Sequence, residues 1–218
     1  MSATASAELV TRDDDGEVLA ALVWRFDQPV VSVSTASIGG GLTLSAWLVN
    51  AQVPSGYARL DLDEHGAQIA GALGLTGNGV VMLTAYDVQR REVATVDGVT
   101  VVATVGVTKP VWAADANVAV DAVPAIGTVN IVVQLPVAHT AAAMVNLVAT
   151  VAEAKCQAFI DWPVPGTGTP SDAVTVVCPA GGEAEVFGGP RSQCGRSTAM
   201  AAYVAITAGL RLGYEPAC

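Results

Sequence analysis

One short stretch of the chain, residues 151–174, holds residue types that could perform acid–base chemistry. Glu153 and Lys155 fall two positions apart on an expected helix, and Asp172 follows after a turn and a loop. Residues two apart do not face each other on a helix, so Glu153 and Lys155 cannot simply pair. A lysine between apolar neighbours either extends to water or lies beside a counter-charge, and Asp172 is the nearest carboxylate by motif. We treat Glu153, Lys155 and Asp172 as catalytic candidates, with a purely structural ion pair as the alternative.

Two glycine-rich loops could hold a polar ligand. The loop before Asp172 alternates glycine with Thr167 and Thr169, which offers backbone amides and two hydroxyls. Gly39 and Gly40 belong to a run of three glycines, which could expose amides as a cradle for an oxyanion or another polar group. A tight hairpin turn explains the same run, and both interpretations stay open.

Polar side chains also occur where a strand is expected. Thr128, Asn130 and Gln134 alternate to one face of the segment 128–135, and apolar residues occupy the other face. Such amides either line a pocket or meet water at a sheet edge. Arg191 lies just before an expected helix N-terminus, where backbone N–H groups are free to bind a ligand.

These residues must be positioned by an α+β arrangement. The patterns predict strands at 17–26, 30–37, 42–50, 80–86, 93–96, 99–108, 128–135 and 173–178, and helices at 61–73, 139–162 and 193–212. Because the strands come mostly in runs before the long helices, we expect a single domain over residues 17–218. Its sheet should be largely antiparallel or mixed, packed with two long helices and one short helix. Residues 1–16 are predicted to be a flexible N-terminus.

Composition narrows the class of protein. The 218 residues are 52% apolar and 14% charged, which suits a folded chain with a sizeable core. A net charge of −10 disfavours nucleic acid and anionic membranes as partners. The cysteines show no CxxC spacing and the two histidines stand far apart, which argues against a metal or redox site. The N-terminal residues lack a basic start and an apolar segment, so we expect no secretory signal, a cytoplasmic protein and reduced thiols.

Several short motifs occur in a fixed order. They are Ser37-Ile38-Gly39-Gly40-Gly41, Leu48-Val49-Asn50, Val80-Val81-Met82-Leu83-Thr84-Ala85, Thr104-Val105-Gly106, Gly127-Thr128-Val129-Asn130-Ile131, Glu153-Ala154-Lys155, the glycine–threonine loop leading to Asp172, and Gly188-Gly189. In this order and spacing, from about residue 30 to 212, the chain resembles the adenosylcobinamide amidohydrolase family. Two residues depart from the pattern: Pro170 replaces a more flexible residue, and Tyr203 stands where a histidine is commoner.

The resemblance implies an enzyme of corrinoid salvage. Such an enzyme cleaves the amide between aminopropanol and the corrin propionate of adenosylcobinamide, which gives adenosylcobyric acid for cobalamin synthesis. It implies no metal or organic cofactor, because the cobalt belongs to the substrate. The partner is then a corrinoid, not nucleic acid or a membrane, and a homo-oligomer is left open. The substrate-binding candidates are Gly39, Gly40, Asn50, Thr84, Thr128, Asn130, Thr167, Thr169 and Arg191.

Two catalytic schemes remain open. In the first, Glu153 or Asp172 activates water, Lys155 supports the charge and the glycine-rich loops bind the oxyanion. In the second, a hydroxyl attacks, from Thr167, Thr169, Ser37 or Thr128, with Lys155 as its base. A Ser-His-Asp triad is disfavoured because His65 and His139 lie outside the motifs, and Cys156 has no histidine nearby in sequence. A corrinoid carrier without activity, or an amidohydrolase for another amide, is the alternative function.

Overall fold

The computed structural model describes residues 4–14, 16–115 and 127–214. Within these ranges the strands are β1 (Glu8–Asp14), β2 (Glu17–Ser34), β3 (Gly41–Gln52), β4 (Gly79–Thr84), β5 (Glu92–Val96), β6 (Val99–Gly106), β7 (Thr128–Gln134) and β8 (Ala173–Cys178). The helices are α1 (Leu62–Ala72), α2 (Ala141–Asp161) and α3 (Gln193–Gly213), with a 3-10 turn at Val88–Arg90. The predicted α+β class, with two long helices and one short one, is confirmed.

All eight strands belong to one mixed sheet. Its order is β4-β3-β2-β8-β7-β6-β5, with β1 paired to β2 outside this path. The pairs β3–β4 and β7–β8 are parallel and the others antiparallel. Although β4 and β7 are far apart in this order, the side-chain amide of Asn130 in β7 donates to the carbonyl of Leu83 in β4. The sheet therefore folds back on itself.

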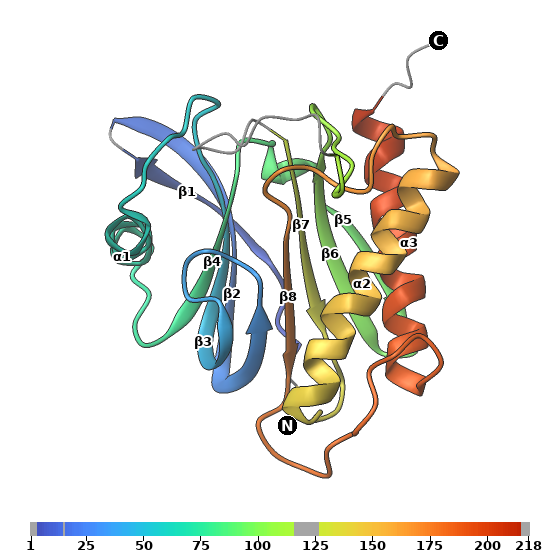
Figure 1. Ribbon diagram of the computed structural model, residues 1–218. Helices are drawn as coiled ribbons and strands as arrows, with labels where there is room; N and C mark the ends of the chain where they lie inside the picture. Colours follow the sequence, from blue (N-terminus) through green and yellow to red (C-terminus); the bar gives the residue numbers. More distant parts are fainter. Residues whose placement is uncertain (1–3, 15, 116–126, 215–218) are drawn as a thin grey trace.

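The folding back produces four layers (Figure 1). Helix α1 covers the outer face of the half made by β1–β4, and α2 and α3 cover the outer face of β5–β8. Between the halves lies a third apolar cluster, which includes Trp24 of β2, Met82 of β4 and Val132 of β7. Each strand alternates between an outer and an inner cluster because successive side chains point to opposite faces.

Strand β7 shows this alternation clearly. Val129, Ile131 and Val133 pack under the helices, and Asn130 faces the interior between the halves. The predicted division of this strand into an apolar and a polar face is confirmed. Its polar side chains are buried between the sheet halves, so they do not meet water at a sheet edge.

Strand β2 differs from its prediction. We expected a break at residues 27–29, but β2 continues through them with a register shift between Arg25 and Val30. An irregularity of this kind bends a strand without ending it, and it also tolerates Pro29. The part after the bend pairs with β8 and so joins the two halves of the sheet.

The N-terminus also differs from its prediction. A flexible segment over residues 1–16 is wrong for Glu8–Asp14, which forms β1 and pairs with β2 in an antiparallel hairpin. Residues 1–3 and 15 lie outside the described part of the chain. The turn predicted at Asp97-Gly98 is confirmed, since both residues adopt the positive φ that a tight β5–β6 hairpin requires.

Helix α2 carries the catalytic candidate Lys155 and begins at an N-cap. Thr140 accepts a hydrogen bond from the backbone N–H of Ala143 at 3.3 Å. By length and composition alone α2 could span a membrane. Its stripe of Met144, Leu147 and Phe159 instead packs into the core against the sheet. The opposite face of the helix is exposed.

Candidate active site

A cleft of about 490 Å³ opens at the end of the sheet where β4 ends and β7 and β8 begin. Its lining comes from segments far apart in sequence: 35–38, 53–62, 81–85, 127–128 and 170–173. Hydroxyl side chains are frequent in it, namely Thr35, Ser37, Ser55, Tyr57, Thr84, Thr128 and Ser171. The charged residues in the lining are Arg59 and Asp172, and most others are apolar. A partly apolar cleft with a few polar groups is typical of small-molecule sites.

Asp172 is fixed at the edge of this cleft by four donors. Its Oδ1 accepts from the backbone N–H of Val129 at 2.9 Å and from the hydroxyl of Thr169. Its Oδ2 accepts from the backbone N–H of Thr169 at 3.0 Å and from Lys155 Nζ. Four hydrogen bonds occupy the usual acceptor positions of a carboxylate. Asp172 is thus held rigidly, with no spare lone pair for a water molecule.

Asp172 supplies the counter-charge that was expected for Lys155 from the sequence. The two side chains are 12% and 13% exposed, so the ion pair is largely buried. Gly168 lies directly against it, because a Cβ there would fall 2.6 Å from both Asp172 Oδ2 and Lys155 Nζ. The glycine therefore makes room for the ion pair, not for a ligand.

Two of the predicted substrate-binding residues line the cleft. Thr84 ends β4 and accepts from the backbone N–H of Tyr86 at 3.0 Å. Thr128 begins β7, and its hydroxyl lies 2.7 Å from that of Ser171. The cleft thus has hydroxyls on both halves of the sheet.

Asn50 and Asn130 meet in the interior but are absent from the lining of the cleft. The side-chain amide of Asn130 donates to Asn50 Oδ1 at 2.8 Å, and that of Asn50 donates to Thr104 Oγ1 at 3.0 Å. Both asparagines are almost fully buried. Their amides pair with each other because the folded sheet places them face to face, and the network joins its halves.

Gly39 and Gly40 form a tight turn beside the cleft. A Cβ on Gly39 would lie 2.1 Å from the carbonyl oxygen of Gly79, and one on Gly40 would lie 2.1 Å from that of Ala36. Gly39 also has a φ of +66°. The glycines are required by close packing within the chain, as in the hairpin interpretation. Their neighbour Ser37 reaches the cleft in their place.

Threonines 167 and 169 hold the loop that carries Asp172. Thr169 is buried, and its hydroxyl lies 2.8 Å from the carbonyl oxygen of Gly127 as well as against Asp172. Thr167 accepts from the backbone N–H of Ala113 at 3.3 Å. Neither threonine lines the cleft, whereas Pro170 between them and Asp172 does.

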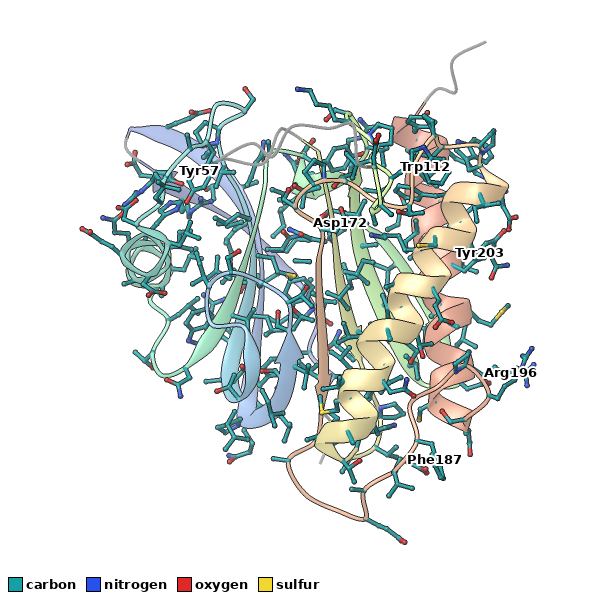
Figure 2. The ribbon with its side chains drawn as sticks, in the orientation of Figure 1. Tyr57, Trp112, Asp172, Phe187, Arg196 and Tyr203 are labelled. Carbon is teal, nitrogen blue, oxygen red and sulfur yellow. The ribbon has the colours of Figure 1, made fainter. Side chains whose placement is uncertain are left out.

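Glu153 and Arg191 lie away from the cleft. Glu153 is exposed on α2, because a position two residues from Lys155 falls on a different face of the helix. Arg191 is exposed just before α3, in the segment that follows Phe187. Phe187 lies at the end of the molecule opposite Asp172 (Figure 2). Tyr203 donates to Asp161 on the outer side of the two long helices. The structure therefore separates these three residues from the candidate site.

Sequence reasoning missed a group on the other wall of the cleft. Tyr57 lines the cleft, and its hydroxyl lies 2.7 Å from Nδ1 of the buried His65. Nε2 of His65 lies 3.2 Å from Asp14 Oδ1. Burial raises the pKa of Tyr57 and keeps its hydroxyl protonated near neutral pH. The only local signal was a histidine on a short helix, since strand β1 supplies the carboxylate from a distance in sequence.

Metal ligands do not gather in the described residues: no group of three or more His, Cys, Asp or Glu side chains could hold an ion there. Cys156, Cys178 and Cys194 are free thiols, and Cys218 lies outside the described residues. Burial raises the pKa of Cys178 and of Cys194, which makes both weaker nucleophiles.

Comparison with known proteins identifies the relatives of this chain. The sequence profile of the family described as adenosylcobinamide amidohydrolase matches residues 6–216. The chain belongs to the adenosylcobinamide amidohydrolase family. An adenosylcobinamide amidohydrolase of Halobacterium salinarum is 32% identical to it over 180 residues, which cover 78% of this chain and 76% of the relative. The resemblance seen in the ordered motifs is confirmed, and at the level of the family so is the class of enzyme that hydrolyses an amide.

Proposed function

We propose that the protein hydrolyses adenosylcobinamide at the amide between aminopropanol and the corrin propionate. The products are adenosylcobyric acid and aminopropanol, and the acid can re-enter cobalamin synthesis. The observation that carries this proposal is the family match over residues 6–216. The hydroxyl-lined cleft supports the proposal, because several of the ordered motifs contribute to its lining.

The chemistry of the cleft suits such a substrate. A corrinoid carries many primary amides, each of which needs both a donor and an acceptor, and a hydroxyl group can serve as either. Thr84, Thr128 and Ser171 provide such groups within the cleft. A volume of about 490 Å³ accommodates the aminopropanol arm and the edge of the ring, with the rest of the macrocycle at the mouth. Leu60 is 80% exposed beside the mouth and offers apolar contact.

The geometry bears on the two catalytic schemes. A hydroxyl nucleophile with Lys155 as base is disfavoured, because Lys155 Nζ is committed to Asp172 and does not line the cleft. The scheme in which a water molecule attacks the amide is therefore favoured. Asp172 contributes by holding Thr169 and the start of β7 in place, and its negative charge lies beside the substrate. With all four of its acceptor positions in use, Asp172 leaves the role of proton acceptor to another group.

The test is to incubate the purified protein with adenosylcobinamide and to measure the release of aminopropanol. Stoichiometric binding with no release would replace the hydrolase with a carrier. No binding, together with release of amine from another amide in a substrate panel, would assign a different substrate. The cytoplasmic location stays a prediction from the sequence, and a homo-oligomer stays an open possibility.

A further inference from the structure

We propose that Tyr57 is a catalytic residue that carries protons at the scissile amide, that His65 positions it and stores the proton, and that Asp14 positions His65. This inference rests on the proposed hydrolysis. It gives the cleft the proton acceptor that Asp172 does not provide.

The three side chains form a continuous path from the cleft into the protein. Tyr57 OH lies 2.7 Å from His65 Nδ1, and His65 Nε2 lies 3.2 and 3.3 Å from the two oxygens of Asp14. Tyr57 comes from the loop before α1, His65 from α1 and Asp14 from β1. Tyr57 and Asp172 lie at the same end of the molecule, on different segments of the chain (Figure 2). The cleft has both in its lining.

For the neutral imidazole, the hydrogen-bond partners select one tautomer. Asp14 as a carboxylate only accepts, which places the imidazole proton on Nε2. In that tautomer Nδ1 presents a lone pair, and the Tyr57 hydroxyl, 2.7 Å away, is its donor. The imidazole is therefore oriented as a base toward the phenol, as a histidine is toward the hydroxyl of a serine hydrolase.

Asp14 is itself held in place by a cation. Arg12 Nη2 lies 2.6 Å from Asp14 Oδ2 and also donates to the carbonyl of Gln52 at 2.7 Å. The side chains of Arg12 and Asp14 are 1% and 12% exposed. A buried carboxylate fixed in this way stabilises the positive charge that develops on His65 when it receives a proton.

The same residues could be a purely structural network that ties α1 to β1. Two observations favour catalysis. Tyr57 faces the cleft, and the other imidazole of the chain, His139, is engaged elsewhere with the carbonyl of Val137 at 3.0 Å. Among the described residues that line the cleft, no other side chain is hydrogen-bonded to an imidazole.

The proton balance closes without a cofactor. As water attacks the amide carbon, its proton passes to the oxygen of Tyr57 while the proton of Tyr57 moves to His65 Nδ1. The C–N bond then breaks, Tyr57 delivers a proton to the departing nitrogen, and His65 returns its proton to Tyr57. Water and amide become carboxylic acid and amine, and the three side chains end as they began.

The decisive variant is Tyr57→Phe, which removes one hydroxyl and keeps the ring. General acid–base catalysis contributes roughly 10²–10⁴-fold, so kcat for aminopropanol release should fall by about this factor while KM changes little. Tyr203→Phe is the matched control, because it removes a hydroxyl hydrogen-bonded to a carboxylate on the outer side of the long helices. It should leave kcat and KM at the wild-type values.

The outcomes separate this inference from the proposed function. A wild type that releases no aminopropanol removes both. An active wild type with an equally active Tyr57→Phe variant removes only the role of Tyr57. A parallel fall in kcat and in the melting temperature of Tyr57→Phe, with kcat restored when the variant is stabilised by lower temperature or an osmolyte, would show a structural network and also overturn the inference.

A second measurement is independent of whether the variant folds. The chain has two histidines, so the imidazole ¹⁵N signals of the wild type can be assigned with His139→Gln. We expect neutral His65 to carry its proton on Nε2, with Nδ1 accepting a hydrogen bond. A proton found on Nδ1 would point the imidazole the wrong way and overturn the inference.

Discussion

Lys155 and Asp172 stand 17 residues apart in sequence and form an ion pair where α2 passes the start of β8. The pair receives little water, since its side chains are 12% and 13% exposed. Asp172 is thereby joined to both an outer helix and the rim of the cleft. Substitutions at this ion pair should therefore change both the stability of the fold and the activity of the site.

Asp172→Asn should destabilise the fold and reduce turnover. The substitution leaves the charge of Lys155 without a counter-charge, and it places the side-chain NH₂ group of the new asparagine next to groups that donate to Asp172. Breaking a buried ion pair in this way costs about 3–5 kcal/mol. Adding Lys155→Met should recover part of the lost free energy of unfolding. Urea denaturation of the two single variants and the double variant measures the coupling. Strictly additive losses would mean that the two side chains do not depend on each other.

Gly168→Ala should be destabilising because its Cβ would lie 2.6 Å from Asp172 Oδ2 and from Lys155 Nζ. Overpacking of this kind costs about 1–3 kcal/mol. Gly181→Ala is the control, since a Cβ there meets nothing within 4 Å. Thermal unfolding compares the two variants. Equal melting temperatures would contradict the close contact between Gly168 and the ion pair.

Asn130→Ala should weaken the fold and leave KM unchanged. It removes the donor to Asn50 Oδ1 and to the carbonyl of Leu83, and each buried group left unpaired costs about 1–3 kcal/mol. The free energy of unfolding and KM for the corrinoid are measured on the same preparation. A raised KM with full stability would instead support the role in substrate binding that the sequence suggested.

Glu153→Gln should retain turnover within about twofold, since surface substitutions away from special features have small effects. The reason is its exposed position on α2, outside the lining of the cleft. In the carboxylate scheme read from the sequence, Glu153 or Asp172 activates water. A complete loss of activity in a folded Glu153→Gln variant would identify Glu153 as that carboxylate. Measuring kcat of this variant tests Glu153, and full activity in both Glu153→Gln and Asp172→Asn would remove the scheme.

The pH dependence of Tyr57 follows from its surroundings. Burial raises its pKa above 10.0, with smaller opposing and reinforcing effects from the charges of Arg59, Asp61 and Asp14. Because the folded protein favours the neutral phenol, this contribution to stability is complete below pH 10 and is lost as pH rises through the folded pKa. The phenolate absorbance of wild type minus Tyr57→Phe should show its step above pH 10. A step well below that value would contradict the burial of the hydroxyl.

Asp61 does not enter that titration, because the Arg59 guanidinium lowers its pKa to about 2. It stays ionised over the whole range in which an amidase would be assayed. An acid limb of the activity profile within that range would therefore not report the titration of Asp61.

The sequence by itself determined the parts of the protein that repeat with a local period. Alternation along residues 128–135 separated the two faces of β7, and helical spacing placed Lys155 on the inward stripe of α2, where it needed a counter-charge. The order of the motifs was enough to identify the family. The two periodic signals survive in a sequence because each depends on neighbours within a few turns or strand positions.

Only the tertiary structure decided which distant residues meet. The bend in β2 folds the sheet back, so Asn50 and Asn130 bond to each other and are not in the lining of the cleft. The β1–β2 hairpin carries Asp14 to His65, which turned a histidine set aside in the sequence into the partner of Tyr57. Local periodicity reports the face on which a side chain lies but not what lies opposite, because closure of the sheet is a long-range event.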